Sequence, residues 1–443
     1  MTSVRAPRNV LVVGSGGREH ALAWRLRRDH GVERVIVAPG NPGMTDVADV
    51  RPSAGLDAAS LAELCDREQV DLVAIGPEAP LVDGLADGLR ARGVAVFGPD
   101  AAAARLEGSK AFCREVARAA RIPMADGVAT EDPAEAMGAV RSFGGRVVIK
   151  ADGLAAGKGV TVCETLAEAE AAIRQAMLER AFGAAGARVV VERALQGPEA
   201  SVIAICDATH VLALPAARDH KRIFDGDRGP NTGGMGAFSP VPELSDADVA
   251  RIAETVHAPV LAEMSRRGTP FRGALFAGLM LTADGPYLLE FNIRFGDPET
   301  QVLLPGMAVP LAPLLAAAAV DRLAEAAHEL GIRGSLIPAT PGSTVGVVLA
   351  ARGYPATPES GDPISGIDEA RGTGALVFCA GVRAGSGAGL VTGGGRVITV
   401  IGRGPDLEAA ARNAYDAADR IAFDGRQLRR DIGRDAALAG ATA

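Results

Sequence analysis

The sequence predicts an α/β protein of several domains, and three observations lead to that prediction. The chain has 443 residues, more than one compact core usually holds. Its first hundred residues alternate short apolar runs with helical patterns. Its 55 glycines and 27 prolines are spread along the chain, as expected where many tight turns join strands to helices.

The N-terminal alternation predicts a doubly wound parallel sheet. The expected strands are Asn9–Gly14, Arg34–Gly40, Leu72–Glu78 and Val94–Pro99, and the expected helices are Glu19–Arg28 and Ala58–Glu68. Ligands of such sheets bind at the carboxyl ends of the strands. Those ends carry the turns GSGGREH, PGNPG and GPEAPL, so we expect a binding site there.

The pattern after Pro99 predicts a second and a third domain. A helix is expected from Ser109, its N-cap. A glycine loop between strands then predicts a small flap on a larger body; its elements are the strands Arg146–Lys150 and Arg188–Glu192 and the helix Leu166–Arg180. From about Arg333, further strands and a helix at Leu407–Ile421 predict another α/β unit. The expected domains are therefore residues 1–105, 106–330 with a flap at about 122–191, and 331–443.

Composition argues against several classes of partner. A net charge of -8, from 54 acids and 46 bases, would repel nucleic acid. The five cysteines form no CxxC pair, which favours reduced thiols in the cytoplasm and argues against zinc. The start has no signal-peptide pattern. The uncharged segment Thr300–Val320 contains three prolines, so we interpret it as buried core leading into an alanine-rich helix and not as a membrane span.

The turn GSGGREH at Gly14–His20 opens a helix, so its N–H groups and the helix dipole favour an anion. A dinucleotide site would need G-x-G-x-x-G and an acid at the end of the second strand. Glu19 stands at the third glycine position and RVIVAPG ends without an acid, which disfavours NAD. A small phosphate ester is the favoured ligand, and a simple tight turn is the alternative.

The loop KADGLAAGKGV at Lys150–Val160 predicts a phosphate site. Its glycines let the backbone surround phosphates, while Lys150 and Lys158 reach them from the strand and from the tip. Gly159 follows Lys158 where a P-loop has Ser or Thr, so a P-loop fold is excluded. A flexible hairpin is the alternative interpretation.

Two more stretches allow both a functional and an ordinary interpretation. In VVVERALQGPEAS, Glu192 and its backbone could meet an adenine edge and Glu199 ribose hydroxyls, although a plain strand and turn would look similar. The segment Arg218–Pro240 mixes charges with Asn231 and several glycines. That composition suits backbone contacts with a ligand as well as it suits a solvated surface.

LLEFNIRFGDPETQ at Leu288–Gln301 is the most informative stretch. Glu290 and Asn292 are two apart on a strand, so both side chains point to the same face. Two hard oxygen ligands suit Mg²⁺ that nucleotide phosphates also bind. Arg294 continues that face and could neutralise a transferring phosphoryl group or hold a carboxylate. A polar edge face does not account for the polar residues directly afterwards, which include Asp297.

Together these stretches resemble the phosphoribosylamine–glycine ligase family, also called glycinamide ribonucleotide synthetases, of the ATP-grasp superfamily. The motifs, in family order, are GSGGREHALAW, GPEAPLVDGLAD, GSKAF, KADGLAAGKGV, DHKR, GPNTGGMGAFSP and RFGDPETQ, followed by VGVVLAARGYP and RRDIG. The resemblance implies an N-terminal doubly wound domain, an ATP-grasp body with a mobile flap, and a C-terminal α/β domain. It implies that ATP, glycine and 5-phospho-β-D-ribosylamine give glycinamide ribonucleotide through glycyl phosphate, in purine synthesis.

The resemblance also implies roles for individual residues. The implied reaction centre is Arg294, Asp297, Asp219 and Lys221, and the implied ligands of Mg²⁺ or Mn²⁺ are Glu290 and Asn292. The implied ATP site is Lys110, Lys150, Gly157, Lys158, Gly159, Glu192, Leu195 and Glu199. The implied substrate contacts are Gly14, Ser15, Gly16, Gly17, Asn41, Glu78, Asn231, Gly233 and Gly234. One departure is Ala194, where the family commonly has an aromatic residue beside the adenine.

Two other functions remain open at this point. The same fold could activate another carboxylate or carboxyphosphate, or the chain could be an ATP-binding sensor without turnover. The intact Lys150, Glu290, Asn292 and Arg294 argue against a sensor. The expected partners are small molecules only, and the expected form is a stand-alone cytoplasmic monomer that touches neither nucleic acid nor membrane.

Overall fold

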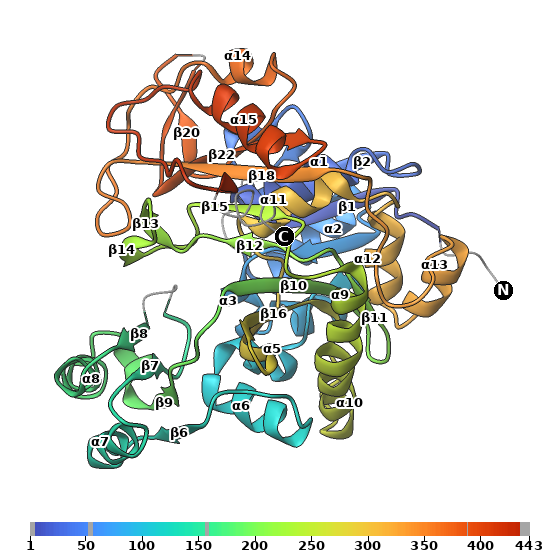
Figure 1. Cartoon of the computed structure of the whole chain (residues 1–443). Coiled ribbons are helices and arrows are strands. Elements are labelled where there is room, and N and C mark those ends of the chain that lie inside the picture. Colours follow the sequence, from blue (N-terminus) through green and yellow to red (C-terminus); the bar gives the residue numbers. More distant parts are fainter. Residues whose placement is uncertain (1–4, 52–55, 156–158, 388, 435–443) are drawn as a thin grey trace.

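The computed structural model of the chain describes residues 5–51, 56–155, 159–387 and 389–434. Figure 1 shows a main body that contains the N-terminal, central and C-terminal elements, with a smaller subdomain set to one side. Strands far apart in sequence share sheets in this body, and the cavity described below lies where the body faces the smaller subdomain.

The N-terminal part is a parallel sheet in the order β3-β2-β1-β4-β5. Its strands are β1 (Asn9–Gly14), β2 (Arg34–Pro39), β3 (Asp49–Val50), β4 (Leu72–Ile75) and β5 (Val96–Phe97). Its helices are α1 (Gly17–Leu26), α2 (Ala58–Glu68), α3 (Glu78–Val82) and α4 (Leu85–Arg90), with a 3-10 turn at Pro42–Met44. Strand β1 is apolar at successive positions because helices cover both faces of a parallel sheet. The strand order reverses between β1 and β4, which places a crevice at their carboxyl ends.

The small subdomain is an antiparallel sheet in the order β6-β9-β7-β8. Its strands are β6 (Gly127–Thr130), β7 (Val147–Ala151), β8 (Val160–Cys163) and β9 (Val189–Arg193). Its helices are α7 (Pro133–Ser142) and α8 (Leu166–Ile173), followed by a π turn at Arg174–Leu178 and a 3-10 turn at Gly183–Ala187. The sequence predicted two of these strands and one helix. Strands β6 and β8 are short, half-exposed edges, so they carry little apolar periodicity.

The central body is an antiparallel sheet in the order β11-β10-β16-β17. Its strands are β10 (Glu199–Cys206), β11 (Val211–Ala213), β16 (Gly273–Thr282) and β17 (Gly285–Asn292). Nearby helices are α5 (Ala101–Gly108), α6 (Lys110–Ala119), α9 (Asp246–Ile252) and α10 (Ala258–Arg266), the last two joined by a π turn at Ala253–His257. Ser109 caps α6 as predicted, because its hydroxyl accepts the Phe112 N–H at 3.1 Å.

The remaining large sheet has the order β12-β15-β18-β22-β19 and is antiparallel throughout. Its strands are β12 (Arg218–Asp219), β15 (Gly236–Ser239), β18 (Ser343–Ala350), β19 (Leu376–Cys379) and β22 (Arg396–Gly404). Two hairpins accompany it: β13 (Arg222–Phe224) with β14 (Arg228–Asn231), and β20 (Val382–Ala384) with β21 (Leu390–Thr392). The helices are α11 (Glu299–Leu303), α12 (Ala312–Ala318), α13 (Leu323–Glu329), α14 (Ile367–Arg371) and α15 (Leu407–Ala418), with a 3-10 turn at Leu304–Gly306. Strands before and after residue 331 thus share one sheet, and the domain limits stay a prediction.

The predicted fold class is confirmed, because a parallel sheet forms the N-terminal part of a mixed α/β protein. The segment Thr300–Val320 is mostly buried and leads into α12, as predicted. Across the described ranges, no helix is long and apolar enough to cross a membrane.

Candidate active site

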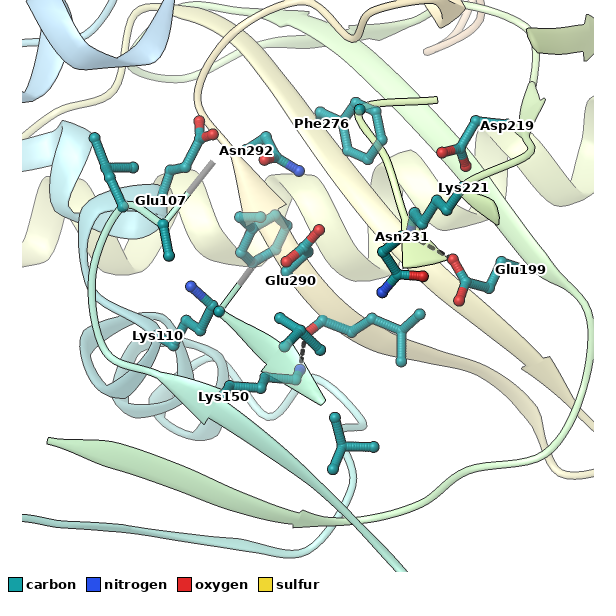
Figure 2. Close-up of a pocket in the computed structure, with 18 of the residues that line it drawn as sticks. Glu107, Lys110, Lys150, Glu199, Asp219, Lys221, Asn231, Phe276, Glu290 and Asn292 are labelled. Atoms are coloured by element: carbon teal, nitrogen blue, oxygen red, sulfur yellow. Dashed lines mark hydrogen bonds and ion pairs between the residues drawn. The ribbon is translucent and has the colours of Figure 1, made fainter. Parts of the chain in front are cut away.

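A cavity of about 780 Å³ lies between the small subdomain and the body. Most of the predicted site residues line it: Glu78, Lys110, Lys150, Gly159, Glu192, Leu195, Glu199, Asp219, Lys221, Asn231, Gly233, Glu290, Asn292, Arg294 and Asp297. Figure 2 shows basic and acidic side chains from several elements pointing into this space. Charged groups that are far apart in sequence therefore meet in one concave site.

Glu290 and Asn292 present two oxygen donors to the cavity from β17, with the same-face spacing that the sequence predicts (Figure 2). Burial opposes ionisation of Glu290, but the ammonium groups of Lys221, Lys150 and Lys110 hold its pKa below the usual value. A carboxylate and an amide oxygen fit Mg²⁺. Within the described residues there is no cluster of three or more metal-binding side chains. That is expected where nucleotide phosphates complete the metal's ligands.

Two lysines face Glu290 from the other side of the cavity (Figure 2). Lys150, at the end of β7, lies 2.7 Å from a carboxylate oxygen of Glu192. The other Glu192 oxygen accepts a hydrogen bond from Arg114 at 2.6 Å. Lys110, at the start of α6, donates to the Gly153 carbonyl at 3.1 Å. The sequence offered Glu192 and neighbouring backbone groups as adenine contacts. Both carboxylate oxygens of Glu192 contact cations in this structure, and the adenine contact stays a prediction.

A second charged group surrounds Lys221, which follows β12. Its ammonium donates to Glu199 at 2.5 Å. Burial would lower the pKa of Lys221, but Glu199, Asp219 and Glu290 raise it well above the usual value. Burial raises the pKa of Asp219. Burial and the charge of Asp219 together raise the pKa of Glu299 to about 7. This part of the site therefore holds one carboxyl, that of Glu299, whose pKa lies near neutral pH.

Arg294 lies just beyond β17 among three oxygen-bearing side chains. Its guanidinium donates to Glu107 at 3.0 Å, to Asn292 at 3.1 Å and to Glu78 at 3.2 Å. Burial works to lower the pKa of Arg294, but the carboxylates of Glu107 and Glu78 raise it above its usual value. Arg294 is therefore a fixed positive charge beside the predicted metal ligands.

Asp297 is held by groups from two different parts of the chain. Its carboxylate accepts from Gln301 at 2.5 Å and from Arg396 of β22 at 2.9 Å. Burial works to raise the pKa of Asp297, but Arg396 and Arg18 hold it below the usual value. The C-terminal sheet thus contributes a charge to the cavity.

Several predicted contacts lie outside the cavity lining: Gly14, Ser15, Gly16, Gly17, Asn41 and Gly234. The anion that the Gly16 N–H meets is the carboxylate of Glu19, at 2.6 Å. Glu19 thus satisfies one N–H at the start of α1 from within the chain. The phosphate contact expected at this turn stays a prediction. Asn41 donates to backbone carbonyls of Ser15 and Cys379, so it joins the N-terminal turn to β19. The predicted contacts Gly157 and Lys158 lie outside the described residues.

Sequence reasoning missed seven charged residues that line the cavity: Arg18, Glu107, Arg114, Arg146, Arg193, Glu299 and Arg396. Two of them carried a usable signal. Arg18 lies inside GSGGREH, and Glu299 lies inside the polar run after Arg294. The other five lie in ordinary helical or strand patterns, and only the folded chain brings them to the site.

This arrangement defines the class of the protein. A small antiparallel subdomain facing an antiparallel body, with lysines opposite hard oxygen ligands, is the architecture of an ATP-grasp ligase, which uses ATP to join a carboxylate to an amine. Family models of phosphoribosylglycinamide synthetase match residues 8–107 (N domain), 108–300 (ATP-grasp domain) and 344–435 (C domain). The chain belongs to the phosphoribosylamine–glycine ligase family and is an ATP-dependent ligase.

Relatives cover almost the whole chain. Phosphoribosylamine–glycine ligases of Mesorhizobium japonicum and Streptomyces coelicolor are each 47% identical to it, over 96% and 97% of this chain and 97% and 99% of theirs. A crystal structure of phosphoribosylamine–glycine ligase from Thermotoga maritima is 35% identical with a TM-score of 0.79, covering 96% of this chain and 99% of that one. The biotin carboxylase domain of Hydrogenobacter thermophilus 2-oxoglutarate carboxylase shares the fold, with 18% identity and a TM-score of 0.71 over 96% of this chain and 92% of that one.

Proposed function

We propose that this chain joins glycine to 5-phospho-β-D-ribosylamine, with ATP converted to ADP and phosphate, to form glycinamide ribonucleotide for purine synthesis. The observation that carries the proposal is the meeting of Lys110, Lys150, Glu290, Asn292 and Arg294 in one cavity. Membership of the phosphoribosylamine–glycine ligase family supports the choice of glycine and the ribosylamine as substrates.

ATP is expected to lie between the small subdomain and the body. Backbone groups of Glu192 and Leu195 would bind the adenine, and Glu199 would reach the ribose. Lys110 and Lys150 would bind the phosphates, together with Gly157, Lys158 and Gly159 of the loop. Met280 also lines the cavity, and it adds apolar surface where Ala194 offers little.

The first chemical step activates the carboxylate. One oxygen of the glycine carboxylate attacks the γ-phosphorus of ATP in line, the bond to the β-phosphate oxygen breaks, and glycyl phosphate and ADP form. Glu290 and Asn292 would hold Mg²⁺ or Mn²⁺, which supplies charge neutralisation to the phosphates when bound. Arg294 offsets charge on the transferring group, so catalysis is mostly positioning and electrostatics.

The second step forms the amide. The ribosylamine nitrogen attacks the carbonyl carbon of glycyl phosphate, phosphate leaves, and the nitrogen loses a proton. Asp219, Lys221 and Asp297 line the cavity, and we propose that they surround this step. Glu78, Asn231 and Gly233 are proposed contacts of the ribosylamine. The predicted contacts around Gly14–Gly17, Asn41 and Gly234 would have to join the site as substrate binds.

Water would destroy both the acyl phosphate and the labile amine. We therefore propose that the small subdomain closes over the cavity before chemistry. We further propose that the protein is a monomer and that it is cytoplasmic. The five free cysteines support a reducing compartment such as the cytoplasm. The proposed partners are ATP, glycine and the ribosylamine alone.

The test is ADP release from Mg-ATP with freshly made phosphoribosylamine, with and without glycine. Release that needs both substrates supports the proposal. If the protein binds ATP tightly but ADP release depends on neither substrate, the ATP-grasp fold still stands and the assigned substrates are wrong. A panel of other carboxylates and amines would then identify the reaction.

A further inference from the structure

The hairpin β13–β14 stands beside the cavity and belongs to none of the larger sheets. Its strands have three and four residues, and their pairing is irregular between Arg222 and Phe224. A two-stranded hairpin of this size is marginally stable by itself in water. Figure 1 shows it on the side of the molecule that faces β7 and β8. Something else in the fold must therefore hold it in place.

The end of this hairpin where its two strands join the rest of the chain carries residues that line the cavity. Lys221 directly precedes β13, and Asn231 ends β14. Both line the cavity, as does Thr232. The Thr232 N–H and hydroxyl donate to the Lys221 carbonyl at 2.7 and 2.8 Å, which ties the two roots together. The direction in which Lys221 and Asn231 point thus depends on the hairpin as a unit.

The C-terminal motif RRDIG contacts both ends of the hairpin. Arg429 donates to the Asp227 carboxylate of the turn at 2.6 Å and to the carbonyl of Arg222, the first residue of β13, at 3.2 Å. It also makes a bidentate pair with Asp431, at 2.7 and 2.6 Å. The Asp431 carboxylate in turn accepts the Gly226 N–H of the turn at 2.8 Å.

Residues next to Arg429 and Asp431 make further hydrogen bonds to the hairpin and to the C-terminal sheet. The Arg430 N–H donates to Asp225 at 2.7 Å. Just before the motif, Gln427 exchanges two backbone hydrogen bonds with Ala350 of β18, each at 2.8 Å. The segment from Gln427 to Asp431 is therefore bonded to the large C-terminal sheet at one end and to the hairpin at the other.

The Arg429 side chain is 1% exposed, while that of its hairpin partner Asp227 is 70% exposed. Burying a guanidinium is costly unless its donors are satisfied. A brace for a surface turn would need no buried charge if stability alone were at stake, because apolar packing would serve as well. The planar Arg429 guanidinium donates hydrogen bonds in fixed directions. It can therefore fix the orientation of the turn, a carbonyl and a carboxylate together, which apolar packing does not do.

We propose that Arg429 and Asp431 are positioning residues for the ligase reaction, which act through the turn of β13–β14 to orient Lys221 and Asn231. The inference rests on the proposed function for the importance of those two residues, but the mechanical link stands on the contacts alone. Neither Arg429 nor Asp431 lines the cavity, so their effect is indirect.

The test uses Asp227, because its replacement removes the ion pair between the turn and Arg429 and leaves the buried Arg429–Asp431 pair intact. Asp227 has a φ of +50°, so Asp227→Gly removes the carboxylate without backbone strain. Asp227→Asn retains an acceptor for Arg429 and also tolerates this φ. Asp284→Gly, in the exposed turn between β16 and β17, is the matched control for the loss of a surface turn carboxylate.

The readouts are backbone hydrogen exchange, the thermal midpoint, and kcat with KM for ATP and glycine. Asp227→Gly is expected to speed exchange of amides in residues 222–231 and to lower kcat about tenfold, since small misplacement of a reacting group has effects of this order. The thermal midpoint should stay near that of the wild type. Asp227→Asn should recover most of kcat, and Asp284→Gly should change neither exchange in residues 222–231 nor kcat.

Faster exchange in residues 222–231 with unchanged kcat and KM would overturn the positioning role, and unchanged exchange would show that the Arg429–Asp227 pair does not hold the hairpin. If Asp227→Gly lowers the thermal midpoint together with kcat, the proposal would also be overturned. The loss of activity would then reflect a general loss of stability. If the wild type shows no glycine-dependent ADP release, the substrate assignment has failed, and the exchange measurement still decides whether the motif holds the hairpin.

Discussion

The guanidinium of Arg396 lies 2.9 Å from the Asp297 carboxylate, although 99 positions separate the two residues in sequence. The same guanidinium donates to the backbone carbonyls of Gly233 and Asp297, at 2.6 and 2.7 Å. Arg396 begins β22, so the C-terminal sheet contributes to the cavity that the predicted metal ligands also line. The C-terminal part is therefore a component of the candidate site.

Arg396→Ala is expected to lower kcat/KM for glycine-dependent ADP release by about 100-fold, because Asp297 loses the charge that keeps it ionised and in place. Steady-state ADP release measures the loss. Arg396→Lys retains the positive charge but loses the planar guanidinium that can donate several hydrogen bonds at once. Its kcat/KM should lie between those of the wild type and Arg396→Ala. Wild-type rates in a folded Arg396→Ala protein would remove this residue from the site.

Lys150→Met is expected to weaken ATP binding by about tenfold or more, because a phosphate ligand is lost and Glu192 keeps only Arg114 as its cation. Calorimetric titration with a non-hydrolysable ATP analogue gives the dissociation constant. Arg188→Met serves as the control, since Arg188 is a partly exposed cation that does not line the cavity. Equal affinity in Lys150→Met and wild type would contradict phosphate binding by Lys150.

Local patterns predicted much of the fold and part of the site. Strand β1 follows from its unbroken apolar run, and helix α2 begins and ends where the periodicity predicts. The two-residue spacing of Glu290 and Asn292 was enough to place both on one face of β17, because the geometry of a strand is local.

Contacts between distant segments could not be predicted in this way. Arg114 meets Glu192 across 78 positions, and Arg396 meets Asp297 across 99. Both arginines lie in ordinary patterns, so no residue spacing marks them as site residues. The two cation partners of Glu192, Lys150 and Arg114, likewise become visible only in the folded chain.

Glu290→Gln is expected to raise the Mg²⁺ concentration needed for half-maximal activity by about tenfold, because an amide oxygen binds this hard cation more weakly than a carboxylate does. Titration of Mg²⁺ at fixed ATP measures the shift, and a parallel titration with Mn²⁺ compares the two metals. Asp284→Asn, an exposed carboxylate of the turn before β17, is the control. A Glu290→Gln curve that overlays the wild type would place the metal elsewhere.

Arg294→Ala is expected to abolish glycine-dependent ADP release, since it removes the fixed positive charge beside the predicted metal ligands. Its loss also leaves the buried Glu107 unpaired, which could destabilise the fold by about 3 kcal/mol. Arg294→Lys retains a charge opposite Glu107 and separates the two effects. A folded Arg294→Lys protein with activity reduced by about 100-fold would support the transition-state role, whereas full activity would oppose it.

Glu299→Gln is expected to change how stability depends on pH. Burial and the nearby Asp219 raise the pKa of Glu299 from 4.5 to about 7 in the folded protein. Between these values the folded state binds more protons than the unfolded state, so this carboxyl contributes stability that is full below pH 4.5 and is lost as the pH rises through about 7. Gln mimics the protonated form and cannot ionise.

The free energy of unfolding of Glu299→Gln minus that of wild type should therefore rise between about pH 5 and about pH 8, by on the order of 1 to 2 kcal/mol. Urea unfolding at intervals of pH measures it, with the exposed Glu254→Gln as the control. A difference that stays constant over this range would mean that Glu299 is already ionised at the lower pH. In that case Asp219 would have to hold the proton that the two carboxyls share, and Asp219→Asn would show the rise instead.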